Sequence, residues 1–265
     1  MDKLPSRPAA SAGTRNASPP LLAVDEPPAF TVVNNQASAS LVLACDHASH
    51  RVPRSLGNLG LDDALLRSHI GWDIGAAQVA RHMSAQLNAV LILANYSRLV
   101  IDINRPLGHS QSIAQYSENT EIPGNCALDK REAQRRAEAC FWPYHETLGG
   151  LVTSAEPHNS ARLLVSVHSF TPVFDGVQRP WQIGILWDTD EDIADSLIEH
   201  LRRQNICVGN NEPYDARDAV GYTTRVHSDR NVLIEIRQDL IDTPAGALRW
   251  ASVLADTVQT KLGPF

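Results

Sequence analysis

The stretch Leu41-Val-Leu-Ala-Cys-Asp-His-Ala-Ser-His50 begins as an apolar run and stops abruptly on an acid and a histidine. A short apolar run with polar ends is typical of a strand buried on both faces, as in a parallel sheet. In open α/β sheets, ligand sites lie outside the carboxyl ends of the strands. Asp46 and His47 occupy that position, so the stretch predicts a buried strand and a reactive site at its end.

Two later stretches repeat this arrangement. Leu163-Leu-Val-Ser-Val-His-Ser-Phe170 carries His168 near its end, and Asn231-Val-Leu-Ile-Glu-Ile-Arg237 has Glu235 inside an otherwise apolar run. An unpaired carboxylate is costly to bury, so Glu235 needs either a partner or a function. If these strands are parallel, their polar residues can converge at one edge of the sheet.

The rest of the chain alternates helical and strand patterns. Such alternation is typical of an α/β protein, and we expect a single three-layer domain whose mainly parallel (mixed) sheet has helices on both faces. Pro143 is expected to kink or divide one of the helices. The predicted helices cover residues 62–68, 73–87, 129–151, 191–204 and 244–261, and the further strands cover 89–94, 182–187 and 206–208.

Two segments have a different composition. Residues 1–39 are rich in Ser, Pro, Ala and Asn, and such a segment buries too little apolar surface to offset its chain entropy. We therefore predict a largely disordered tail, of which residues 30–39 can pack on a catalytic domain spanning 40–265. Residues 107–125 are predicted to form a functional loop, and the sequence leaves open whether it closes over a substrate.

Composition excludes several classes of function. The net charge of −7, without a cluster of Lys and Arg, argues against a nucleic-acid surface and favours a small-molecule substrate. No window reaches the roughly 18 apolar residues of a membrane span, and no signal peptide is recognisable, so we expect a cytoplasmic protein. Its oligomeric state does not follow from the sequence. No Cys-x-x-Cys pair occurs among Cys45, Cys126, Cys140 and Cys207, which argues against a zinc ribbon or redox site.

His47, His168 and Asp73 are the candidate metal ligands. Two strand-end histidines and a carboxylate at the start of a helix would make a three-residue site with a position left for water, as in catalytic zinc sites. Because an Asp at a helix start is often an N-cap, His69 and His50 stay open as alternative third ligands. Zinc is the expected ion, although the same ligands also suit manganese, cobalt or iron.

Glu235 is the candidate general base that takes a proton from water beside the metal. The structural alternative is an ion pair of Glu235 with Arg237 or Arg98. Arg98 and Arg105 are candidates for binding the substrate, because a guanidinium can hold a carboxylate through two parallel hydrogen bonds.

Further residues are expected around these groups. His227 and Arg237 are candidates for the rim of the substrate pocket. Asp46 is expected to orient a metal ligand or an arginine, since ligating histidines usually need a partner on their second nitrogen. Asp102 is expected to orient one of the arginines, and His69 and Asn104 complete the set of supporting residues.

Seven motifs match one known family in order, from about residue 30 to the C-terminus. They are Cys45-Asp-His-Ala-Ser49 with Val52-Pro53, His69-Ile-Gly-Trp-Asp-Ile-Gly-Ala76, Tyr96-Ser-Arg-Leu-Val-Ile-Asp-Ile-Asn-Arg-Pro106, Ile122-Pro-Gly-Asn125, Val167-His-Ser-Phe-Thr-Pro172, Asn211-Glu-Pro-Tyr214 and Leu233-Ile-Glu-Ile-Arg-Gln-Asp-Leu240. Through these motifs the chain resembles the N-formylglutamate amidohydrolase family.

The resemblance implies a zinc-dependent hydrolase with a phosphorylase/hydrolase-like fold and a layout like that of zinc carboxypeptidases. Carried over residue by residue, it implies His47 and His168 as ligands, Asp73 as the acidic ligand and Glu235 as the catalytic glutamate. The expected reaction is hydrolysis of an N-acyl amino acid, most simply N-formyl-L-glutamate to formate and L-glutamate. A zinc amidase or peptidase acting on another N-acyl amino acid or a short peptide, and an inactive binding module of the same fold, are the alternatives.

Overall fold

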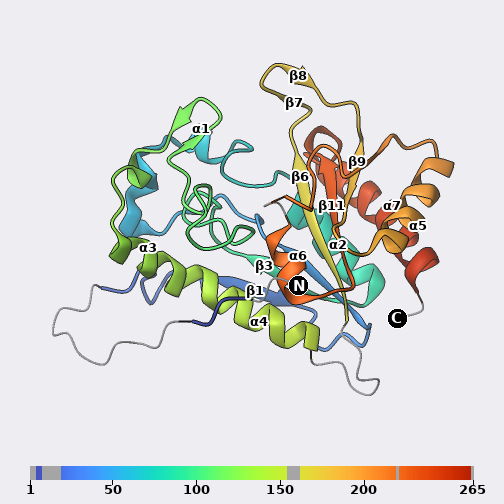
Figure 1. Ribbon diagram of the computed structural model, residues 1–265, viewed down its shortest axis with the longest axis horizontal. Helices are drawn as coiled ribbons and strands as arrows, with labels where there is room; N and C mark the ends of the chain where they lie inside the picture. Colours follow the sequence, from blue (N-terminus) through green and yellow to red (C-terminus); the bar gives the residue numbers. More distant parts are fainter. Residues whose placement is uncertain (1–3, 8–18, 154–161, 219–220, 264–265) are drawn as a thin grey trace.

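In the computed structural model, residues 4–7, 19–153, 162–218 and 221–263 are described. Within them, a seven-stranded sheet has the order β1-β3-β2-β6-β11-β9-β10 (Figure 1). Two small hairpins stand apart from this sheet. The strands of the sheet are β1 (Phe30–Val33), β2 (Leu41–Cys45), β3 (Val90–Ala94), β6 (Leu163–Phe170), β9 (Ile183–Leu186), β10 (Val208–Asn210) and β11 (Asn231–Arg237). The hairpins are β4 (Tyr116–Ser117) with β5 (Thr120–Glu121), and β7 (Val173–Phe174) with β8 (Val177–Gln178).

The four central strands, β3, β2, β6 and β11, are parallel to one another. At one edge, β1 is antiparallel to β3. On the other side, β9 is antiparallel to β11, and the edge strand β10 is parallel to β9. All five residues of β2 are buried, as expected for a strand covered on both faces. The predicted mixed, mainly parallel sheet is therefore confirmed.

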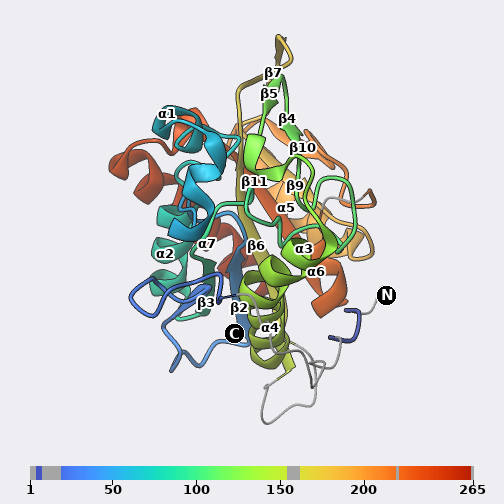
Figure 2. The same cartoon turned by 90° about the vertical axis from the view of Figure 1, so that its left-hand side faces the viewer.

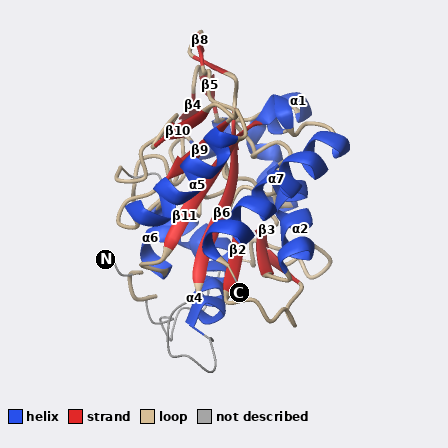
Figure 3. Ribbon diagram, turned by 90° about the vertical axis from the view of Figure 1, so that its right-hand side faces the viewer, coloured by secondary structure: helices blue, strands red, loops and turns tan. Residues whose placement is uncertain are grey.

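Helices cover both faces of this sheet. α2 (Ala76–Leu87), α5 (Glu191–Arg203) and α7 (Pro244–Leu262) pack on the face that Figure 3 turns toward the viewer. α4 (Trp142–Thr153) and α6 (Tyr222–His227) lie on the opposite face (Figure 2). The short helices α1 (Asp63–Leu66) and α3 (Lys130–Arg136) complete the α-helical set of the described residues. None of the described helices is long and apolar enough to span a bilayer.

Side-chain alternation along the strands decides which polar residues share a face. In β2, Leu41 and Leu43 pack toward α2 and α7, whereas Val42 and Ala44 pack toward α4. Continuing this period of two places Asp46 on the α4 side. In β6 the same alternation puts Ser166 and His168 on the side of Leu164, which also packs toward α4. The polar ends of β2 and β6 therefore meet on one face.

The predicted break at Pro143 takes a specific form. α3 continues directly into a π-helical stretch, Ala137–Phe141, and then into α4. Pro143 lacks an N–H and its ring crowds the carbonyl four residues earlier, which lies in this stretch. The wider π turn leaves room for the proline ring, so the helix continues from α3 into α4 with no loop between them.

Residues 19–39 belong to the packed domain, although their composition predicts a tail. Leu21 is only 2% exposed within the core, and β1 forms an edge of the sheet. The carbonyls of Pro27 and Pro28 accept hydrogen bonds from the side chains of Tyr96 and Asn95. This segment is thus held by hydrogen bonds to its backbone carbonyls, and such bonds leave no periodic pattern of apolar residues in the sequence. Residues 1–3 and 8–18 lie outside the described residues.

Candidate metal centre

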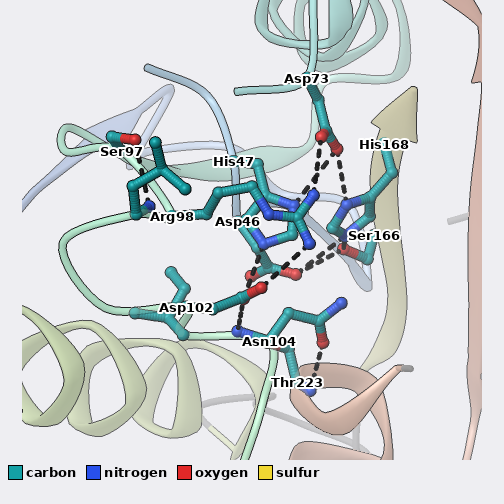
Figure 4. A network of polar contacts seen from close by, with 12 residues as sticks. Asp46, His47, Asp73, Ser97, Arg98, Asp102, Asn104, Ser166, His168 and Thr223 are labelled. Atoms are coloured by element: carbon teal, nitrogen blue, oxygen red, sulfur yellow. Dashed lines mark hydrogen bonds and ion pairs between the residues drawn. The ribbon is translucent and has the colours of Figure 1, made fainter. Parts of the chain in front are cut away.

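His47, Asp73 and His168 converge at the carboxyl ends of β2 and β6 (Figure 4). One potential ligand atom from each residue lies within 4.8 Å of the other two. Oδ2 of Asp73 is 2.8 Å from Nδ1 of His168 and 3.4 Å from Nδ1 of His47. All three side chains are at most 3% exposed. The structure therefore brings together the three residues that the sequence analysis singled out as ligands, and they could hold a divalent cation.

Asp73 is not the N-cap that its position suggested. The helix begins later than predicted, and its N-cap is Gly75 in the left-handed conformation. Asp73 precedes this turn, and its backbone N–H donates to the carbonyl of His47 at 3.0 Å. Because the turn at Gly75 separates the carboxylate from the helix, Asp73 is free to face the two histidines.

Hydrogen bonds determine which nitrogen of each histidine can bind a metal. Nε2 of His47 lies 2.8 Å from Oδ1 of Asp102, and Nε2 of His168 lies 3.0 Å from Oδ2 of Asp46. An ionised carboxylate only accepts, so both Nε2 atoms donate and each Nδ1 is directed toward Asp73. In the described part of the chain, the buried Nδ1 of His47 has no hydrogen-bond partner. A cation could therefore meet both Nδ1 atoms beside Asp73, where it would take the place of the proton that Nδ1 of His168 shares with this carboxylate.

Asp46 and Asp102, which accept hydrogen bonds from the Nε2 atoms of the two histidines, are themselves held by further hydrogen bonds. Asp46 accepts hydrogen bonds from the hydroxyls of Tyr144, at 2.7 Å, and Ser166, at 3.1 Å. It also contacts Nε2 of His168, so it is placed to orient that ring. Asp102 accepts from the guanidinium of Arg98 at 3.0 Å and from the backbone of Asn104 at 2.9 Å. Asp102 thus joins His47 to the arginine that it was expected to orient.

The histidines of the cluster bind protons strongly. Burial disfavours a charged imidazole, but hydrogen bonds to Asp46 and Asp73 outweigh it and raise the pKa of His168 well above its usual value. Burial also opposes ionisation of Asp73, yet His47 and His168 lower the pKa of this carboxyl. A cation that binds here would replace protons held by the histidines.

Glu235 extends from β11 in register with His168 of β6. It is 4% exposed, and its Oε2 has no hydrogen-bond partner within the described ranges. Burial raises the pKa of Glu235 to about 7. The alternative ion pairs are not formed, because Arg237 pairs with Asp239 at 2.8 Å and Arg98 pairs with Asp102.

A cavity of about 240 Å³ is lined by the cluster, Glu235, Arg98 and Arg105. The charge of Arg98 is balanced by Asp102 and by Asp73, whose Oδ1 lies 3.5 Å away. Arg105 has no ion pair among the described residues, and its buried Nε has no hydrogen-bond partner there. Burial lowers the pKa of Arg105. An unpaired guanidinium in a cavity is suited to bind an anion.

The remaining candidates lie farther from the cluster. His69 lines the cavity but pairs with Glu118 at 2.9 Å, and the His50 ring packs against Trp72 without lining the cavity. Neither alternative third ligand thus belongs to the cluster. The two candidates for the rim, His227 and Arg237, do not line the cavity.

Several residues that the structure places at the site were not predicted from the sequence. Ser166 and Tyr144 hold Asp46, and Tyr214 lines the cavity. Ser166 was detectable, because it interrupts an apolar strand two residues before His168 and must therefore share its face. Tyr144 lies on a helix far along the chain, and no local pattern marks its contact with Asp46.

Residues 39–242 match the model of the N-formylglutamate amidohydrolase family. The chain belongs to the N-formylglutamate amidohydrolase family. It is accordingly a hydrolase that acts on an amide, and the resemblance in its motifs is confirmed.

Solved structures share the fold of this chain. The chain is 36% identical to a gene product from Agrobacterium tumefaciens, with a TM-score of 0.88 and coverage of 91% of this chain and 98% of that one. An N-formylglutamate amidohydrolase from Ralstonia eutropha is 20% identical, with a TM-score of 0.61 and coverage of 86% and 98%, and shares the fold. No curated protein matches the chain.

A pair of neutral histidines, the buried His145 and the half-buried His227, holds the loop that carries Asp102 and Arg105. Nε2 of His145 lies 2.9 Å from the carbonyl oxygen of Ile103, so this nitrogen must donate. Nδ1 of His145 then accepts a hydrogen bond from Nε2 of His227, 2.8 Å away. Burial lowers the pKa of His145 to about 4 and that of His227 to about 3.

These depressed pKa values predict a loss of stability in acid. In the unfolded chain both imidazoles bind protons below about pH 6.5, whereas in the folded chain they stay neutral. The stability they contribute is therefore present above about pH 6.5 and is lost as the pH falls. Compared with His227→Gln, the wild type should lose about 1.4 kcal/mol more per pH unit below that value, measured by urea unfolding. Parallel pH profiles for the two proteins would contradict a neutral His227.

Proposed function

We propose that the protein hydrolyses an N-acyl amino acid, most simply N-formyl-L-glutamate, to formate and L-glutamate. The single observation that carries this proposal is the buried His47–Asp73–His168 cluster, which opens on a cavity with an unpaired carboxyl group and an unpaired guanidinium. A small anionic amide matches those groups, and membership in the family supports the same substrate.

The donor set fits a divalent cation, and we propose zinc. His47 and His168 would bind through Nδ1 and Asp73 through a carboxylate oxygen, which is a common combination in catalytic zinc sites. The unpartnered Nδ1 of His47 supports this assignment. When bound, such an ion polarises the acyl group and lowers the pKa of a water molecule.

Glu235 is the proposed general base. Its free Oε2 takes a proton from the attacking water as the new bond to the acyl carbon forms. The same carboxyl group then gives that proton to the departing amine nitrogen as the carbon–nitrogen bond breaks. A carboxyl group without a hydrogen-bond partner among the described residues is placed to accept a proton and to return it.

Arg105 is the proposed contact for a substrate carboxylate. Arg98 also lines the cavity, but its charge is balanced by two aspartates, so we assign it mainly to holding Asp73 and Asp102 in place. His227 and Arg237 have no part in substrate contact in this proposal.

Removal of the metal tests the activity as a whole. We expect freshly purified protein to release formate from N-formyl-L-glutamate, to lose this activity after treatment with a chelator, and to regain it with one equivalent of zinc. Formate is measured directly, and a panel of other N-acyl amino acids and short peptides is assayed in parallel. Activity that is unaffected by complete metal removal would refute the metal site. A faster reaction with another member of the panel would refute N-formylglutamate as the preferred substrate.

Glu235→Gln tests the base. The amide keeps the size of the side chain but cannot accept the proton, so kcat should fall roughly 10²- to 10⁴-fold while bound zinc is unchanged. Glu118→Gln is the matched control, because Glu118 lines the same cavity but pairs with His69 outside the cluster. A variant at position 235 with wild-type kcat would show that another group acts as the base.

Arg105→Gln tests the carboxylate contact. A hydrogen bond to a charged group contributes about 1.5–3 kcal/mol, so KM for N-formyl-L-glutamate should rise roughly 10- to 100-fold. Arg135→Gln, which removes a half-buried arginine that pairs with Glu132 and does not line the cavity, should leave KM unchanged. Equal KM values for the two variants would exclude Arg105 as the contact.

A further inference from the structure

Tyr214 lines the cavity but has no part in the reaction described above. It ends the segment Asn211-Glu-Pro-Tyr214, which crosses closely over two strands. A Cβ atom on Gly184 of β9 would lie 2.2 Å from the carbonyl oxygen of Glu212, and one on Gly209 of β10 would lie 2.7 Å from the same atom. Only glycine leaves room for this crossing.

The same crossing brings the segment beside the proposed base. Gly184 is the cross-strand partner of Glu235, and a Cβ on Gly184 would also lie 3.3 Å from the Cβ of Glu235. Both side-chain ends of Asn211 bond the backbone of Trp187, at 2.9 and 3.0 Å, and so fix the start of the segment. The backbone of this segment therefore passes beside the strand position of Glu235, and Tyr214 and Glu235 line the same cavity.

Arg179 fixes the phenol ring. Its guanidinium carbon lies 4.6 Å from the ring centre of Phe174, 4.9 Å from that of Tyr214 and 5.8 Å from that of Phe170. Arg179 is only 8% exposed and has no carboxylate partner among the described residues. Burying such a charge is costly, and the aromatic faces offset part of that cost. The arrangement stabilises one orientation of the Tyr214 ring.

The hydrogen bond to Arg179 also determines what the hydroxyl group of Tyr214 can do. NH1 of Arg179 donates to this oxygen at 3.1 Å, so the phenol accepts on that side. Its own proton has no acceptor in the described part of the chain. Burial, reinforced by the charge of Glu235, raises the pKa of Tyr214, so the group keeps its proton at neutral pH. A fixed donor is therefore available to a ligand in the cavity.

We infer that Tyr214 is a substrate-contact residue, whose hydroxyl donates a hydrogen bond to the acyl oxygen of the scissile amide. This inference rests on the proposed function. The carbonyl oxygen is the acceptor of an amide, and it gains negative charge as water adds to the acyl carbon. A donor held in place beforehand stabilises that charge most in the transition state. Arg179 acts through Tyr214 and is a positioning residue.

Tyr214→Phe tests the contact, because it removes the hydroxyl and leaves the ring against Arg179. With N-formyl-L-glutamate we expect kcat to fall roughly 10²-fold, while KM stays within about threefold of the wild-type value. Tyr116→Phe is the matched control, since Tyr116 is 54% exposed, bonds Glu121 and does not line the cavity. Its kcat should equal that of the wild type.

A second substrate separates a contact from a merely structural role. In N-thioformyl-L-glutamate the acceptor is sulfur, which accepts hydrogen bonds weakly. The ratio of wild-type to Tyr214→Phe kcat should therefore shrink several-fold with this substrate, whereas a distorted site would lower both rates equally. An unchanged kcat, a loss confined to KM, or the same ratio for both substrates would overturn the contact.

The assay of the wild type separates a failure of the proposed function from a failure of the role of Tyr214. If the wild type releases formate and Tyr214→Phe does so at the same kcat, only the role of Tyr214 fails. If the wild type releases no formate, the proposed function fails and the contact fails with it. Should Tyr214→Phe not fold, Arg179→Lys keeps the phenol and loosens its orientation, and an unchanged kcat in that folded variant would also overturn the inference.

Discussion

One carboxylate oxygen, Oδ2 of Asp73, lies between the Nδ1 atoms of two buried histidines, and the rest of the site depends on this contact. Buried imidazoles and a carboxylate packed this closely need either protons or a cation to balance them. The protein directs both Nδ1 atoms inward by binding each Nε2 to a separate aspartate. The two Nδ1 atoms are thereby directed toward one carboxylate before any ligand arrives.

The fold supports this arrangement from both sides of the sheet. Parallel strands bring His47 and His168 to one edge, while the turn before α2 supplies Asp73. From the opposite face, Tyr144 on α4 reaches Asp46. The chain between β3 and β4 contributes Asp102, which is held in turn by Arg98 and the backbone of Asn104 (Figure 4). The site is therefore built from rigid elements whose positions the core determines, as precise metal and catalytic sites require.

Much of this architecture could be predicted from the sequence, because buried strands and their polar ends leave a strong local signal. The runs that end near His47 and His168, and the acid within β11, indicated the edge of the sheet where the site lies. Asp73 was harder to assign, since a helix-start Asp usually caps its helix, and only the turn at Gly75 shows that it does not. Tyr144 and Arg179 act through contacts with residues far away in the sequence, and the local pattern of apolar and polar residues does not predict such contacts. Residues 19–39 pack through single buried side chains and backbone bonds, so composition alone did not reveal them.

Anomalous X-ray scattering from crystals of freshly purified protein, recorded across the absorption edges from manganese to zinc, tests the proposed metal site most directly. We expect a single zinc peak at the cluster, about 2.0–2.1 Å from Nδ1 of His47 and of His168, with an oxygen of Asp73 as the third protein ligand. A metal bound through Nε2, or a metal held by other residues while this cluster stays empty, would contradict it.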